Sequence, residues 1–232
     1  MTHSPLEMAP VFRLGPVPIT DPVIVTWAIM AVLMLFAAIV SRHLSLQPSK
    51  RQVTLEMLVG AVDAQIRDTM QAEPGPYRAL IGTIFIFILT ANWSSLIPGV
   101  EPPTSHIETD TALALIVFFA TMFFGIRTRG LGGYLATFAD PIWIMTPINV
   151  FEQFTRTFSL IVRLFGNIMS GVFVIGILLS LAGLLVPIPF MALDLLTGAI
   201  QAYIFTVLAM VFIGASIAEG SKQASIQQRA TS

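Results

Sequence analysis

The sequence predicts an all-α integral membrane protein with about five transmembrane helices and one amphipathic surface helix. Of its 232 residues, 55% are hydrophobic and only 11% are charged, and the mean hydropathy is +0.83. Soluble domains carry about 25% charged residues, so this composition indicates a chain that lies largely in lipid. Five apolar segments approach the roughly 20 residues that a helix needs to cross a bilayer: residues 23–40, 78–97, 111–126, 147–186 and 188–218.

The chain begins with a polar, proline-rich arm over residues 1–22. This arm lacks the basic start of a secretory signal peptide. The apolar run 23–40 that follows it is therefore expected to remain in the protein as the first membrane span, with the arm on the non-cytoplasmic side.

A surface helix is predicted over about residues 53–71, between the first two spans. Its apolar residues recur at the spacing of one helix face, as expected for a helix that lies on the membrane surface. These residues are Leu55, Leu58, Val59, Val62 and Ile66. Pro74, Gly75 and Pro76 then interrupt the chain before the second span.

The basic residues predict the orientation of the spans. Nine of the 12 lysines and arginines lie in residues 41–78, 127–146 and 221–232. Five spans with the N-terminus outside place all three regions in the cytoplasm, as the positive-inside rule requires. We therefore expect a single membrane domain over residues 23–220 and a cytoplasmic tail over residues 221–232.

The fourth and fifth apolar segments are too long for ordinary spans. Forty helical residues extend about 60 Å, whereas the hydrocarbon core is about 30 Å thick. The fourth segment has no proline between Pro147 and Pro187 that would break it. We expect two long, steeply tilted helices that form a hairpin over about residues 147–218, with its turn near Pro187.

Nothing in the sequence is typical of an enzyme active site or of a cofactor site. The chain has no cysteine, and its three histidines are scattered along it. This pattern excludes disulfides and thiolate metal sites. Phosphate loops and nucleophile motifs are also missing from the sequence. We expect neither a cofactor nor a metal, and no nucleic-acid partner.

A polar stripe runs along the fourth segment at spacings of three and four residues, which places it on one helix face. Arginine at the centre of a membrane helix costs roughly 2.5 to 3.5 kcal/mol, so such a residue suggests a function. On the fifth segment, Asp194 and Gln201 lie two turns apart and are expected near this stripe. The stripe consists of Arg156, Ser159, Arg163, Gly166, Asn167 and Ser170.

Two interpretations of the stripe remain open. Arg163 and Asp194 could form a buried pair that fixes helix packing, although such pairs often add little net stability. Alternatively, Asp194 relays a proton or another ion, and Arg163 acts as an electrostatic gate.

The start of the third span also has two interpretations. Glu108 and Asp110 could be a solvated helix start that the helix dipole favours. Alternatively, they line an outer entrance together with His106, since imidazole titrates near neutral pH. Asn92 and Ser95 could line the same opening, or Asn92 could make a packing hydrogen bond.

Several of these segments resemble subunit a of the F-type ATP synthases. The Arg163-Leu-Phe-Gly-Asn167 segment, preceded by Arg156, is similar to the family signature. The segment from Gln201 to Leu208, seven residues after an acid, is similar to a second family motif. The resemblance covers roughly residues 50–220 and extends to Asn92-Trp-Ser-Ser-Leu-Ile-Pro98 and Pro103-Thr-Ser105.

This resemblance implies a non-catalytic stator subunit in a bacterial plasma membrane. Its partners would be the c-ring, the peripheral-stalk b subunits and the rest of the synthase. It would couple a gradient of H⁺, or else Na⁺, to ATP synthesis through two half-channels. Arg163 would face the ring carboxylate beside Gln201, and Asp194 would belong to a half-channel. Further path residues would be Asn167, Ser170, Glu108, Asp110 and His106.

The sequence departs from the family pattern at two positions. Val172 stands where some relatives carry a glutamate, so Asp194 must supply the carboxylate. Thr157 replaces a common proline. Two rivals predict different results: a self-contained secondary transporter would conduct alone and would carry a sequence repeat, whereas a structural anchor would tolerate Arg163→Ala.

Overall fold

The structure, a computed structural model, describes residues 12–14, 17–41, 50–97, 100–139, 146–183 and 186–230. The start of the N-terminal arm, His3, His43 and residues 184–185 of the predicted turn lie outside this part of the chain. The predicted all-α membrane class is confirmed. Its helices are α1 (Asp21–Ser41), α2 (Lys50–Met70), α3 (Arg78–Trp93), α4 (Ile107–Ala139), α5 (Thr146–Ala182) and α6 (Pro187–Ala230).

Three short elements complete the described fold. Strands β1 (Phe12–Leu14) and β2 (Val17–Ile19) pair antiparallel in the N-terminal arm, a hairpin that the sequence did not lead us to expect. Two 3₁₀ turns, η1 (Ser94–Leu96) and η2 (Pro103–Ser105), connect α3 to α4.

Five helices are long and apolar enough to cross a membrane, which agrees with the predicted number of spans. The third begins at Ile107 rather than near Thr111, because the polar residues before Thr111 already belong to α4. The spans are Asp21–Val40, Arg78–Leu96, Ile107–Thr128, Pro147–Leu181 and Pro187–Ile217.

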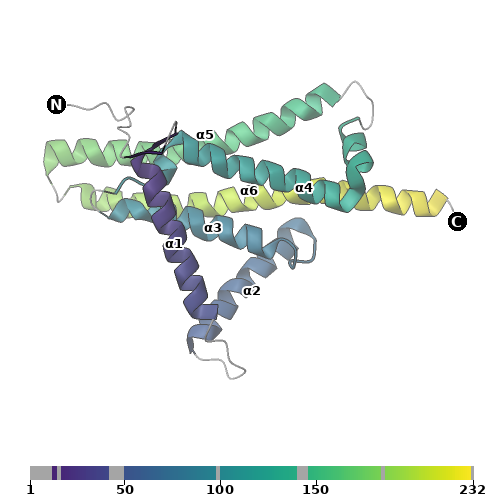
Figure 1. Cartoon of the computed structure of the whole chain (residues 1–232), viewed down its shortest axis with the longest axis horizontal. Helices are drawn as coiled ribbons and strands as arrows, with labels where there is room; N and C mark the ends of the chain where they lie inside the picture. The colour runs from purple at the N-terminus through teal and green to yellow at the C-terminus, as the bar shows by residue number, and fades with distance from the viewer. Residues whose placement is uncertain are drawn as a thin grey trace.

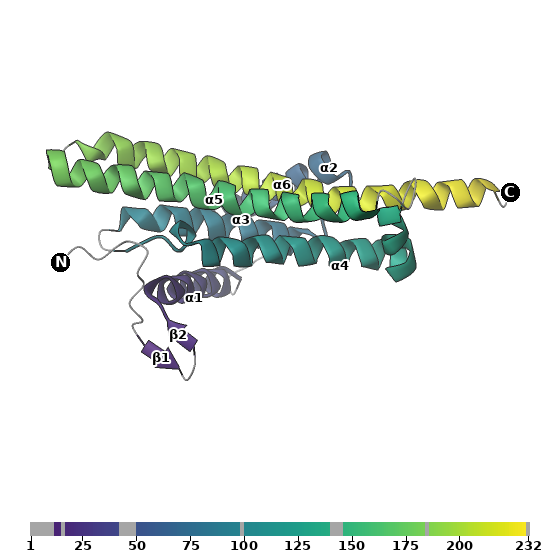
Figure 2. The ribbon, with the colours of Figure 1, turned by 90° about the horizontal axis from the view of Figure 1, so that it is seen from above.

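The last two helices form the predicted hairpin. Helix α5 has 37 residues and α6 has 44, so at 1.5 Å per residue they extend about 55 and 66 Å. Gly183 follows α5 with a φ of 69°, a left-handed conformation that glycine adopts readily after a helix end. Pro187 begins α6, at a position where the missing N–H costs nothing. Figures 1 and 2 together show the two helices side by side near the end of α5 and the start of α6, and Figure 1 shows them diverging toward the start of α5.

Helix α6 lies at the centre of the bundle. It packs against α2, α3, α4 and α5, and Figure 1 shows α3 to α6 running along the same long axis while α1 and α2 form a V to one side. The core lies where these helices meet and is made of aliphatic and aromatic side chains. Its fully buried members include Ile81, Ile88, Leu164, Phe205 and Ile213.

Helix α4 is bent near its C-terminal end. Gly130 has a φ of 73° and interrupts the helical backbone, and Figure 1 shows the chain turning there. The helix continues to Ala139, so part of the connection between the third and fourth spans is itself helical.

The surface helix α2 is joined to α3 by an ion pair. Arg78 donates two hydrogen bonds to the Asp63 carboxylate, each with an N–O distance of 2.5 Å. The Arg78 guanidinium holds the pKa of Asp63 below its ordinary value. Arg78 lies two residues after Pro76, at the end of the Pro74-Gly75-Pro76 break, so this pair fixes the angle at which α2 meets α3.

We expect Asp63→Asn to lower the midpoint temperature of thermal unfolding of the assembled complex at neutral pH. Because the folded-state pKa of Asp63 is lowered, its stabilisation is complete above the ordinary value of 3.8. That stabilisation is lost as the pH falls through the lowered value. Melting curves of both proteins should therefore converge in acid. Asp68→Asn, at an exposed position on the same helix, is the control; an equal effect of both variants would contradict the role of the pair.

Candidate functional site

Arg163 projects from the exposed face of α5. Residues Leu160, Leu164 and Ile168 form the opposite, buried face that packs into the bundle. Within the described part of the chain, neither an ion pair nor a hydrogen bond joins Arg163 to another residue. The packing pair between Arg163 and Asp194, one of the two interpretations of the sequence, is therefore not formed.

The predicted polar stripe follows this exposed face. Ser159, Gly166 and Ser170 are exposed with Arg163, as their spacing predicts. Asn167 is half-buried, and its side-chain Nδ2 is buried without a hydrogen-bond partner. The stripe thus lies on the surface that α5 presents to lipid or to another protein.

A cavity of about 260 Å³ lies between α5 and α6 on the N-terminal side of Arg163. Arg156 is held there by an ion pair with Glu152, and its guanidinium lies 5.4 Å from the centre of the Phe212 ring. Both contacts stabilise the positive charge of the Arg156 guanidinium. Of the two arginines that line this cavity, Arg156 is partnered and Arg163 is free to meet an external anion.

Asp194 is buried between the two hairpin helices. Its exposed fraction is 8%, and a Cβ placed on Gly171 of α5 would lie only 1.9 Å from its Oδ1. The Ser95 hydroxyl, which donates a hydrogen bond to the Asn92 backbone carbonyl at 3.0 Å, lies near the same carboxylate. Gly171 therefore leaves the space that the Asp194 carboxylate fills, a role that the sequence did not reveal because it depends on how the helices are rotated.

Asn92 connects three elements at the C-terminal end of α3. Its Nδ2 donates to the Gly198 carbonyl of α6 at 2.9 Å, and its Oδ1 accepts from the Thr104 hydroxyl of η2 at 2.7 Å. Both bonds are buried. The structure thus favours the packing interpretation of Asn92, which fixes η2 and α6 beside Ser95.

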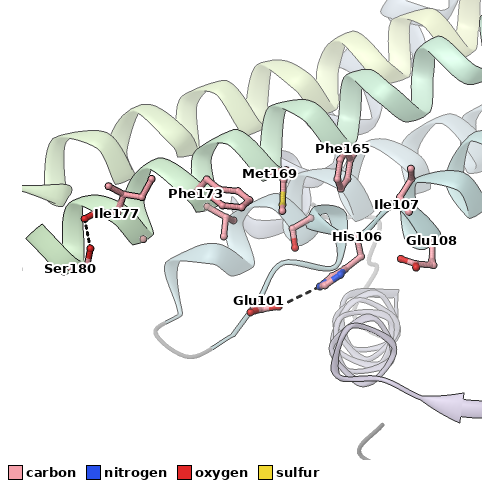
Figure 3. A pocket seen from close by; sticks show the side chains of 12 residues that line it. Glu101, His106, Ile107, Glu108, Phe165, Met169, Phe173, Ile177 and Ser180 are labelled. Atoms are coloured by element: carbon pink, nitrogen blue, oxygen red, sulfur yellow. Dashed lines mark hydrogen bonds and ion pairs between the residues drawn. The ribbon is translucent and has the colours of Figure 1, made fainter. Parts of the chain in front are cut away.

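A second cavity, of about 400 Å³, separates the start of α4 from the C-terminal half of α5. Figure 3 shows Glu101 and His106 pointing toward one another there, with Phe165, Met169 and Phe173 along the α5 wall. His106 Nε2 lies 3.4 Å from Glu101 Oε2, an ion pair when the imidazole is protonated. Glu108 and Ser105 also line the cavity.

The outer residues differ from the sequence-based expectation in two respects. His106 and Glu108 share the second cavity, whereas Asp110 is fully buried and is not among the residues that line it. Glu101 was not singled out from the sequence, although an acid just before Pro102-Pro103-Thr104 was a visible signal. Gln201 is buried on α6 at 6% exposure, with its Nε2 unpartnered.

Comparisons with known proteins show the family to which the chain belongs. A family model described as ATP synthase A chain matches residues 23–214. ATP synthase subunit a 2 of a Bradyrhizobium species is 55% identical over 96% of this chain and 100% of that protein. ATP synthase subunit a of Albidiferax ferrireducens is 45% identical over 84% of this chain and 85% of its own length. Subunit a 2 of Acaryochloris marina is 48% identical over 83% of both chains.

Proposed function

Because the chain belongs to the family of ATP synthase A chains, we propose that it is the ion-translocating stator subunit of an F-type ATP synthase. In this role it couples an ion gradient across a bacterial plasma membrane to ATP synthesis. It has no catalytic site of its own, since the chemistry of ATP belongs to partner subunits. The proposed partners are the c-ring, which faces α5, and the peripheral-stalk b subunits.

The position of Arg163 between the two cavities is the observation that carries this proposal. The α5 residues that line the 260 Å³ cavity end at Arg163, and those that line the 400 Å³ cavity begin at Phe165. Two half-channels that open to opposite sides of the membrane require two cavities that are offset in this way along α5. The first cavity would open to the cytoplasm and the second to the outside, with the N-terminus outside and the C-terminus inside.

Arg163 would meet the membrane carboxylate of each ring subunit in turn. That carboxylate must be neutral to face lipid, because a bare charge in an apolar medium is costly. A fixed guanidinium beside it favours the ionised form and so promotes release of the bound ion. The same positive charge repels cations and prevents a direct leak between the half-channels.

The remaining residues would guide the ion to and from the ring. Asp194 would relay the ion in the outer half-channel, with Ser95 beside it, and Gln201 would lie near the site of exchange. Asn167 and Ser170 would line the α5 side of the path. His106 and Glu108 would form the outer entrance, which Glu101 extends.

ATP synthesis by the whole complex in sealed vesicles tests this function. We expect synthesis under an imposed H⁺ gradient or, if Na⁺ is the coupling ion, under a Na⁺ gradient alone. A complex assembled without this chain is the control and should synthesise no ATP under either gradient.

Two outcomes would contradict the stator role. Equal synthesis by the complex without this chain would make the chain dispensable. Ion or solute transport by the purified chain alone would instead support a self-contained transporter.

A further inference from the structure

The last turn of α3 holds one turn of α6 by its backbone. Asn92 donates from Nδ2 to the Gly198 carbonyl at 2.9 Å, and the indole N–H of Trp93 donates to the Leu195 carbonyl at 3.3 Å. Both acceptors lie within the four residues that follow Asp194. Among the described residues, these are the two hydrogen bonds that α3 side chains donate to α6, so the polar contact between the two helices is concentrated on the turn that begins at Asp194.

Gly198 allows α3 to approach α6 this closely. A Cβ placed on Gly198 would lie 3.1 Å from the Asn92 Cβ, so a larger residue there would push the two helices apart. Gly198 follows Asp194 by one helical turn and therefore shares its face of α6. The Asp194 carboxylate fills the space that Gly171 leaves on α5, and Asn92 fills the space that Gly198 leaves on α6. One turn of α6 is thus in close contact with both α5 and α3.

Thr104 extends this contact to the outer cavity. Its hydroxyl donates to Asn92 Oδ1 at 2.7 Å, and both side chains are buried. Because the oxygen and the nitrogen of the Asn92 amide are both bonded, the amide has one favoured orientation. Thr104 belongs to η2, which packs against α1, α3, α4 and α5, and Ser105 and His106 after it line the outer cavity. A chain of hydrogen bonds therefore connects the wall of that cavity to the backbone of α6.

These hydrogen bonds fix the register of α6 against α3. The carbonyls of Leu195 and Gly198 lie inside a helix, where a carbonyl already accepts the backbone N–H four residues later. A carbonyl has a second lone pair, so a side-chain donor can bond it without breaking the helix. In apolar surroundings a donor that loses its partner is costly, and both donors therefore resist rotation or sliding of α6. Since Asp194 begins this turn, the register decides where its carboxylate lies.

We propose that Trp93 and Thr104 are positioning residues for ion transfer. Together with Asn92 they hold the turn of α6 that begins at Asp194, and so they set the place at which the Asp194 carboxylate takes up the ion. This inference rests on the proposed stator function, in which Asp194 relays the ion in the outer half-channel. Neither Trp93 nor Thr104 binds the ion; each acts through the backbone of α6.

The dependence of ATP synthesis on ion concentration tests the proposal. The whole complex is reconstituted in vesicles at a fixed potassium diffusion potential, and H⁺, or Na⁺ in a separate series, is varied on the non-cytoplasmic side. Trp93→Phe keeps an aromatic ring but removes the N–H, and Thr104→Val removes the hydroxyl at nearly constant volume. Because a displaced carboxylate takes up the ion less readily, each variant should raise the half-saturating ion concentration. The expected rise is about two- to tenfold, which corresponds to the loss of one hydrogen bond.

Three variants serve as matched controls. Thr104→Ser keeps the hydroxyl and should restore the wild-type half-saturating concentration. Trp27→Phe makes the same change at an exposed tryptophan of α1, away from α6. Thr121→Val removes a buried hydroxyl that bonds the backbone of its own helix. The Trp27 and Thr121 variants should both behave as the wild type does.

A structural role alone would give a different result. If Trp93→Phe and Thr104→Val lower only the maximal rate and leave the half-saturating concentration unchanged, the proposal is overturned, because a smaller number of assembled complexes has that effect. An equal shift in Trp27→Phe would overturn it as well. If Thr104→Val does not assemble, Trp93→Phe decides alone, since the Trp93 side chain is 47% exposed and can be shortened without leaving a buried cavity.

The stator function is tested separately by Arg163→Ala. If that variant loses ATP synthesis while Trp93→Phe and Thr104→Val keep the wild-type half-saturating concentration, the positioning role alone is wrong. If Arg163→Ala synthesises ATP at the wild-type rate, the stator function itself is wrong.

Discussion

Replacing Arg163 with alanine is expected to abolish ATP synthesis by an assembled complex under an ion gradient. Arg163 is exposed on α5 without a partner in the described part of the chain, so its removal takes no contact from the bundle and the subunit should still fold. Under the proposed function, what is lost is the cation that faces the ring carboxylate. An interaction of about 3 kcal/mol corresponds to a loss of more than about 100-fold in rate.

The same substitution should increase the passive ion leak. Without the guanidinium, nothing repels cations at the boundary between the two cavities, so vesicles that carry the variant should lose an imposed gradient faster than wild-type vesicles. Arg156→Gln is the control, because Arg156 is compensated by Glu152 and Phe212; it should retain most of the synthesis. Synthesis at the wild-type rate in Arg163→Ala would instead support the alternative that the protein is a structural anchor.

Gly171→Ala is expected to have the second-largest effect. The added methyl group would lie 1.9 Å from Asp194 Oδ1 and 2.8 Å from its carboxyl carbon, closer than any real contact. The Asp194 carboxylate must therefore leave its place beside Ser95, or α5 and α6 must separate. Overpacking of this kind costs typically about 1–3 kcal/mol, and ion-driven synthesis should fall by at least about tenfold.

Gly82→Ala on α3 is the matched control for Gly171→Ala. A Cβ at Gly82 meets nothing within 4 Å, and alanine favours the helix by roughly 1 kcal/mol over glycine. This variant should synthesise ATP as the wild type does and be no less stable. Equal rates for both variants would show that the ion does not depend on the Asp194 carboxylate at this place.

The architecture was accessible from the sequence because hydropathy and helix rise are local properties. The apolar segments predicted five spans, and the 40-residue fourth segment predicted a long helix before the contacts of that helix were known. The spacing of Ser159, Arg163, Gly166 and Ser170 predicted their common face, since helical periodicity alone fixes it.

The contacts between helices could not be predicted from the sequence. That Asp194 meets Gly171 depends on the rotation and axial position of α6 against α5, which no single segment encodes. Glu108 and Asp110 are two residues apart in one acidic helix start, yet Glu108 lines a cavity while Asp110 is buried in the core. The sequence could not separate their roles, because burial is decided by the helices that pack around α4.

The central place of α6 has a mechanical consequence. In the proposed stator role, the chain would experience a sideways force each time the ring turned, and that force would arrive on the exposed face of α5. Because α6 contacts α5 along the hairpin and also packs against α2, α3 and α4, the force is shared among all of these helices. Stiffness of the whole bundle, rather than of α5 alone, would then keep Arg163 at a constant distance from the ring carboxylates that the proposed function places opposite it.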